Sequence, residues 1–151
     1  MRKASIFILP CLIAAALLAG CGGGDDSSST STQAALTKSE FLKQGNAICA
    51  KGNKATNKIA SQTFTQNQKP TQAQLQQFTT EVTPIIQGEI DGIKALGAPA
   101  GDEQQVNAIL DDAQSALDKA KQDPSVFANG DPFKKANQEA KAYGLTACGG
   151  G

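Results

Sequence analysis

The spacing of apolar side chains limits this chain to helical folds. Beyond residue 36 of the 151-residue sequence, apolar residues recur three or four positions apart, and no stretch alternates apolar and polar residues over the length of a strand. A repeat near 3.6 residues places apolar side chains on one face of an α-helix, whereas a half-buried strand needs a repeat of two. The pattern therefore predicts an all-α domain.

Four segments carry the helical pattern, at about 37–62, 71–96, 102–122 and 131–144. The first two open with a threonine followed three residues later by Glu40 or Gln74, which is the sequence of a capping box. Asp131 suits the N-cap of the fourth helix, and Gly144 suits its left-handed end. Because short connections favour antiparallel neighbours, we expect an antiparallel four-helix bundle over 37–148, with the fourth helix running back along the first.

The N-terminus has the anatomy of a secretory signal peptide. Two basic residues precede an apolar run over 4–19, which is shorter than the roughly 20 residues that a membrane-spanning helix needs. The run ends in "LAGC", which resembles a bacterial lipobox and implies a diacylglyceryl group on the sulfur of Cys21. We therefore expect a lipoprotein signal peptide over 1–20 and a chain anchored by lipid to the cell membrane, facing outside the cytoplasm. The alternative is an ordinary signal peptide followed by a chance cysteine.

A polar segment separates the lipobox from the first helix. Residues 22–35 contain three glycines, four serines and two threonines. Such a segment cannot bury enough apolar surface to fold, so we expect 21–36 to be a lipidated, flexible linker. As a flexible chain it would span on the order of 20 Å and hold the domain off the bilayer. A disordered tail is expected over 149–151.

Two of the four cysteines are left to pair with each other. Cys11 leaves with the signal peptide and Cys21 takes the lipid, which leaves Cys49 and Cys148. An even pair outside the cytoplasm is most simply one disulfide bond, which would close a loop of about 100 residues. The alternatives are two free buried thiols, or a metal or redox site. The chain has no C-x-x-C pair and no further soft ligands to support such a site.

Three short motifs carry a family resemblance. They are "NAIC" at 46–49, "LGAPAGDE" at 96–103 and "GLTACGG" at 144–150. Together they resemble a group of small actinobacterial lipoproteins, in which N-x-x-C on the first helix and G-L-x-x-C near the C-terminus recur. The resemblance implies secretion and the cysteine pair. The group has no assigned activity, so the resemblance transfers no functional residue to this chain.

Composition removes several classes of function. The chain has no histidine, so it lacks the commonest general base near neutral pH and the commonest transition-metal ligand. Its formal net charge of +0 gives no basic field for nucleic acid. We therefore expect no enzyme activity, no cofactor, no metal and no nucleic-acid partner.

What remains is a non-enzymatic binding or interaction module in the cell envelope, whose partner is an envelope protein or polymer. The alternative is a carrier of a small apolar ligand held between the helices, with Pro84 kinking the second helix and opening a gap near Glu89. Glu89 falls near the middle of that helix's apolar face. We favour a solvated edge or a lysine-paired position for this carboxylate, and a ligand-binding role in a pocket is the other hypothesis.

Overall fold

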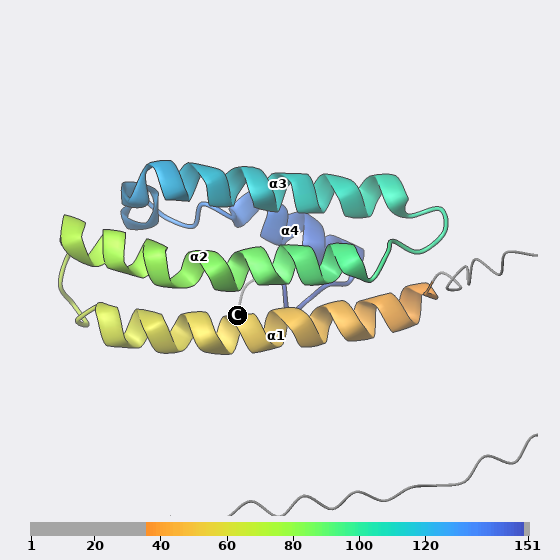
Figure 1. Cartoon of the computed structure of the whole chain (residues 1–151), viewed down its shortest axis with the longest axis horizontal. Coiled ribbons are helices and arrows are strands. Elements are labelled where there is room, and N and C mark those ends of the chain that lie inside the picture. Colours follow the sequence, from red (N-terminus) through yellow and green to blue (C-terminus); the bar gives the residue numbers. More distant parts are fainter. Residues whose placement is uncertain (1–35, 150–151) are drawn as a thin grey trace, which may run out of the picture. The chain divides into compact units, whose positions relative to one another are not determined.

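Residues 36–149, the part of the chain that the computed structural model describes, fold into four α-helices and one short 3-10 helix, with no strand among them (Figure 1). The elements are α1 (Lys38–Thr63), α2 (Gln72–Ala95), α3 (Glu103–Gln122), η1 (Pro124–Ala128) and α4 (Lys134–Tyr143). The predicted all-α, four-helix architecture is confirmed. The expected signal peptide, the lipobox Cys21 and the linker as far as residue 35 lie outside the described residues.

Both predicted capping boxes mark helix starts. At α1, the Thr37 backbone N–H donates to Glu40 Oε2 over 3.0 Å, and the Glu40 N–H donates to Thr37 Oγ1 over 3.3 Å. The same two bonds join Thr71 and Gln74 at the start of α2, at 2.9 and 3.3 Å. The Gln74 side-chain amide also donates to the carbonyl of Thr63 over 2.8 Å. This bond ties the first turn of α2 to the last turn of α1.

The fourth helix begins later than expected and packs against a different helix. It begins at Lys134, three residues after Asp131, whose carboxylate accepts from the Phe133 N–H over 2.8 Å and so caps the preceding turn. α2 packs between α1 and α3, whereas α4 packs on α3 and makes no close backbone approach to α1 within the described residues (Figure 1). The prediction that this helix runs along α1 is therefore wrong, because α4 has only ten residues and the chain crosses to α1 after it.

The C-terminal segment 144–149, and not α4, brings the backbone close to α1. Gly144 ends α4 at a φ of +113°, a left-handed conformation that glycine adopts without strain, as predicted. Asn46 of α1 then donates to the Gly144 carbonyl over 3.1 Å and accepts from the Ala147 N–H over 2.7 Å. The predicted disulfide between Cys49 and Cys148 is present, with the two Cα atoms 5.0 Å apart.

The core is filled by large side chains at the end of the bundle where α1 begins. Phe41 and Leu145 are fully buried there, and the Phe41 ring meets the Tyr143 ring edge to face with centroids 6.1 Å apart. The Tyr143 hydroxyl donates to Asp102 Oδ2 over 2.7 Å, and the Lys38 ammonium lies 3.2 Å from the same oxygen. This network holds the start of α1, the α2–α3 loop and the end of α4 together.

Candidate functional site

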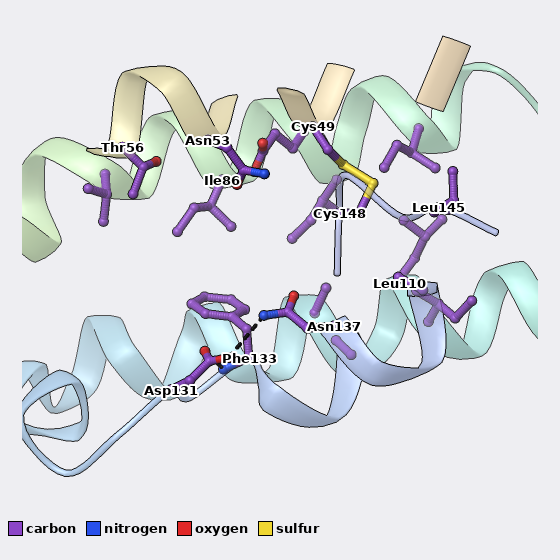
Figure 2. Close-up of a pocket in the computed structure, with 18 of the residues that line it drawn as sticks. Cys49, Asn53, Thr56, Ile86, Leu110, Asp131, Phe133, Asn137, Leu145 and Cys148 are labelled. Atoms are coloured by element: carbon purple, nitrogen blue, oxygen red, sulfur yellow. Dashed lines mark hydrogen bonds between the residues drawn. A yellow bond between two sulfur atoms is a disulfide. The ribbon is translucent and has the colours of Figure 1, made fainter. Parts of the chain in front are cut away.

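Beyond this packed end, the helices enclose a cavity of about 330 Å³. Figure 2 shows its two sides, with Cys49, Asn53 and Thr56 of α1 facing Phe133 and Asn137 of the α4 region. Every helix of the described domain contributes to the lining. The lining residues are Cys49, Asn53, Thr56, Asn57, Phe78, Val82, Ile86, Glu89, Ile90, Ile93, Val106, Ile109, Leu110, Ala113, Phe127, Asp131, Phe133, Ala136, Asn137, Ala140, Leu145 and Cys148.

On α1, small residues face the bundle interior next to the cavity. After Phe41, the next buried positions of this helix are Gly45, Cys49 and Gly52, and the side chains of Leu145 and Glu89 pack over the two glycines. On the opposite side, the short α4 covers only part of the length of α1. Protein interiors are normally packed to the density of organic crystals, so an opening of this size is an unusual feature of a small domain.

One wall of the cavity is aromatic. The Phe127 ring of η1 packs edge to face on the Phe78 ring of α2, with centroids 5.1 Å apart. Phe133 continues the row, with its centroid 6.4 Å from that of Phe127. Branched aliphatic side chains of α2 and α3 extend the apolar surface further into the bundle. Such a lining favours an apolar body of a ligand over water.

Three of the polar side chains at the cavity already bond within the protein. The Asn53 side-chain amide donates to the carbonyl of Ala147 over 2.6 Å. The Asn137 side-chain amide donates to Asp131 Oδ2 over 3.0 Å, and the other carboxylate oxygen of Asp131 accepts a hydrogen bond from the Phe133 N–H (Figure 2). These side chains therefore fix the shape of the cavity rim, and their strongest hydrogen-bonding atoms are used in doing so.

Glu89 is the exception among the polar groups. Its side chain is half-buried and lines the cavity, and its Oε1 atom is buried with no hydrogen-bond partner. Burial away from water raises the pKa of the Glu89 carboxyl from 4.5 to about 7, because desolvation penalises the charged form. Among the described residues no lysine pairs with Glu89, so the favoured paired position is not seen. The ligand-binding role of Glu89 remains a prediction.

Another buried oxygen without a partner belongs to Glu139 on α4, and its surroundings differ. The other carboxylate oxygen of Glu139 lies 3.8 Å from the Lys135 ammonium, so this group has a cation beside it. Glu139 does not line the cavity. Glu89 is thus the lining residue whose carboxyl group has neither a cation nor a hydrogen-bond donor beside it.

Gly52 makes room for Glu89 on the facing helix. A Cβ atom built on Gly52 would overlap with Oε1, Cδ and Cγ of Glu89. Any side chain at this position would therefore displace the carboxyl group. The glycine that weakens the helix propensity of α1 is explained by this contact.

Pro84, which we expected to open the gap, does not line the cavity. It is exposed, and α2 is continuous through it from Gln72 to Ala95. The residues of α2 that line the cavity include Val82, Ile86 and Glu89, which recur at helical spacing on the opposite side from Pro84. The expectation that the proline opens the gap is therefore not supported by its position.

Other chemistry is sparse in the described part of the chain. Residues 36–149 contain no group of three or more His, Cys, Asp or Glu side chains placed to hold a metal ion. None of the helices within that range combines the length and apolar character needed to cross a membrane. The acidic residues of α3 are partly paired at the surface, with Asp112 2.8 Å from Lys135 and Asp118 3.2 Å from Lys121.

Sequence reasoning identified Glu89 and the two cysteines, which lie together at the cavity, but it missed most of the rim. Asn53 follows Cys49 by one helical turn, and this spacing is the signal that would have placed it on the same face. The sequence indicated Asp131 only as a helix cap, and nothing in it indicated Asn137 as a residue of the cavity.

No family model, no characterised protein and no solved structure matches this chain. The site therefore rests on its geometry.

Proposed function

We propose that this chain is a lipid-anchored binding module of the bacterial cell envelope that holds a small apolar molecule in the cavity between its helices. The observation that carries the proposal is the cavity of about 330 Å³ in the middle of the bundle. Small-molecule sites are typically concave, mostly apolar and supplied with a few polar groups that orient the ligand, and this cavity has those properties.

The volume indicates the size of the occupant. A dry engineered cavity of about 150 Å³ binds benzene, which has six non-hydrogen atoms. By proportion, a cavity of about 330 Å³ has room for roughly a dozen such atoms. This is the size of a small aromatic or short-chain aliphatic compound and is too small for a folded partner or a long polymer segment.

Binding is proposed instead of catalysis because the two carboxyl groups at the cavity do not form a working pair. Asp131 is engaged by the Phe133 N–H and the Asn137 amide, at 2.8 and 3.0 Å. Only Glu89 is left with an unpartnered oxygen. Glycoside hydrolysis, for example, uses two carboxyl groups placed on either side of the scissile bond.

Location is supported by the N-terminal sequence and by the disulfide. A lipid on Cys21 would hold the domain close to the outer face of the cell membrane. Disulfide bonds persist outside the cytoplasm, and the Cys49–Cys148 bond is part of the cavity wall. An envelope protein or polymer that receives the ligand remains a prediction, which cross-linking in intact cells would test.

A cavity-filling variant tests the binding proposal. Ala113→Leu adds bulk to a lining position of α3, and Ala108→Leu makes the same change at an exposed position of that helix. Indole is a suitable neutral probe, because the chain has no tryptophan and the fluorescence of bound indole is read without background. We expect Ala113→Leu to weaken indole binding about tenfold or more, with Ala108→Leu equal to wild type. Equal binding by Ala113→Leu and wild type would refute the proposal.

A further inference from the structure

We infer that the ligand of this cavity carries a cationic head, an ammonium group on an apolar body, which binds against the carboxylate of Glu89. The inference rests on the proposed function, since it names the chemical class of the molecule that the cavity holds. It is carried by three observations: the sign of the charges at the cavity, the unpartnered oxygen of Glu89, and the apolar character of the remaining wall.

The ionisable groups of the lining all have the same sign. Among the described residues that surround the cavity, Glu89 and Asp131 are acidic, none is basic, and the two cysteines are locked in the disulfide. An anionic ligand would meet two carboxyl groups and no counter-charge. In a half-buried site, where water screens poorly, such like charges repel and a positive charge is attracted.

The two carboxyl groups are not equally available. Both oxygens of Asp131 accept hydrogen bonds from the protein, one from the Phe133 N–H and one from the Asn137 amide. The buried Oε1 of Glu89 accepts none. A carboxyl group that has lost the hydrogen bonds it would make to water is destabilised, so a ligand donor that reaches the Glu89 carboxyl group from the cavity compensates part of that loss. A charged donor recovers more than a neutral one, because hydrogen bonds between ions are roughly twice as strong.

The protein supplies no alternative partner for Glu89 on the facing helix. The carboxyl group packs directly over Gly52, where the absence of a side chain leaves only backbone. Burial raises the pKa of Glu89 to about 7, because desolvation penalises the charged form of the carboxyl group. A neighbouring ammonium group would favour the ionised form, so binding and ionisation of Glu89 reinforce each other.

The rest of the lining suits an apolar body of aromatic or aliphatic type. The rings of Phe78, Phe127 and Phe133 form a continuous wall, with neighbouring centroids 5.1 and 6.4 Å apart. Aromatic ligands gain from edge-to-face contacts with such rings in addition to the burial of their apolar area. The ligand class is therefore an arylalkyl or short alkyl amine of roughly a dozen non-hydrogen atoms, by comparison with known apolar cavities.

Three probes with one apolar body separate charge from burial. They are 4-phenylbutylamine, 4-phenylbutan-1-ol and 5-phenylvalerate, which carry positive, neutral and negative heads on the same phenylbutyl group. Calorimetric titration of the full-length chain at about pH 8 measures each affinity. We expect the amine to bind about tenfold or more tightly than the alcohol, and the carboxylate to bind most weakly; tenfold corresponds to about 1.4 kcal/mol.

Two matched variants assign the difference to one side chain. Glu89→Gln keeps the size of the side chain and removes its charge, and Glu81→Gln makes the same change at an exposed position two turns earlier on α2. We expect Glu89→Gln to weaken amine binding about tenfold while alcohol binding stays within about twofold. Glu81→Gln should leave all three affinities unchanged. Circular dichroism of both variants controls for loss of fold.

The outcomes separate this inference from the proposed function. Three results would each refute the inference that the ligand has a cationic head. They are equal binding of amine and alcohol to wild type, tightest binding of the carboxylate, and an unchanged amine affinity in Glu89→Gln. Alcohol binding that Ala113→Leu abolishes would still support an apolar site in those cases. Absence of binding by all three probes would overturn both proposals together.

Discussion

Gly52 of α1 and Glu89 of α2 are packed so closely that a Cβ atom on the glycine would overlap with the glutamate carboxyl group. The contact joins two features that seem unrelated in the sequence, a helix-weakening glycine and an acid on an apolar face. The glycine provides the space, and the carboxyl group occupies it without a hydrogen-bond partner for Oε1. The pair therefore places a carboxyl group without a partner at a cavity whose wall is mostly apolar.

Gly52→Ala should destabilise the fold, although alanine is the better helix former. The new methyl group forces the Glu89 side chain to move, and overpacking of this kind typically costs about 1–3 kcal/mol. Gly88→Ala is the matched control, because a Cβ atom at this helical position meets nothing within 4 Å. The control should gain about 0.5–1 kcal/mol from helix propensity alone. Urea unfolding measures both, and an equal gain in the two variants would show that the contact is absent.

Glu89 should make the fold more stable at acidic pH than at alkaline pH. The pKa of its carboxyl is about 7 in the folded chain against an ordinary 4.5, so folding opposes ionisation. The stabilising contribution of the protonated form is complete below about 4.5 and is lost as the pH rises through 7. Above that pH, Glu89→Gln should exceed wild type in stability by on the order of 1 kcal/mol, after allowance for solvent screening.

The measurement is the difference in unfolding free energy between wild type and Glu89→Gln at several pH values. Other carboxyl groups, such as Asp102 and Asp123, have lowered pKa values, so their stabilising effect is present above the unfolded pKa and lost in acid. Taking the difference removes their shared contribution. A difference that stays constant between about pH 5 and 8 would contradict the buried, desolvated position of Glu89.

Local sequence signals predicted the helices well. The capping boxes at Thr37 and Thr71 and the left-handed Gly144 depend on neighbours within four residues, so the sequence contains all the information needed. The cysteine pair was predictable for another reason, because the expected lipidation of Cys21 and loss of Cys11 with a signal peptide would leave only Cys49 and Cys148 to bond. These features are determined before tertiary packing is known.

The cavity could not be predicted in the same way. Its lining comes from every helix of the described domain, so its presence depends on how the helices pack against one another. The position of Glu89 was ambiguous, since a carboxylate on an apolar stripe can face solvent, a lysine or a space. Only the opposing Gly52 decides between them, and its distance from Glu89 in sequence hides that relationship.

Removal of the disulfide should loosen the wall of the cavity as well as lower stability. The bond joins residues 99 apart in sequence, and a loop of about that length is worth up to about 4.7 kcal/mol in the chain-entropy model. The double variant Cys49→Ser with Cys148→Ser should lose about 3–5 kcal/mol by urea unfolding. Asn46 and Asn53 still bond the segment 144–149, so a folded state should persist. Unchanged stability would show that the bond adds no constraint.

Binding of the neutral indole probe should weaken in the same double variant. Leu145 and Cys148 both line the cavity from the C-terminal segment, which the disulfide holds against α1. Greater motion of this segment lowers the fraction of molecules whose cavity is complete, and the apparent affinity falls in proportion. Comparison with Asn46→Ala, which loses hydrogen bonds to the same segment but keeps the disulfide, separates the covalent effect from the polar contacts.

Tyr143 gives a direct optical measure of the packed end of the bundle. It is the single tyrosine of the chain, so alkaline absorbance titration reports it alone. Burial, followed by the hydrogen bond to the Asp102 carboxylate, raises the pKa of its hydroxyl well above the ordinary 10.0. The raised pKa keeps the hydroxyl protonated in the folded state, so we expect no tyrosinate signal until the chain unfolds. The stability that the neutral hydroxyl contributes is present below 10.0 and is lost as the pH rises beyond it.

Asp102→Asn should lower the midpoint of the tyrosinate titration, while Asp111→Asn, an exposed change on α3, should leave the midpoint unchanged. A wild-type midpoint near 10.0 in the folded state would contradict the Tyr143–Asp102 bond.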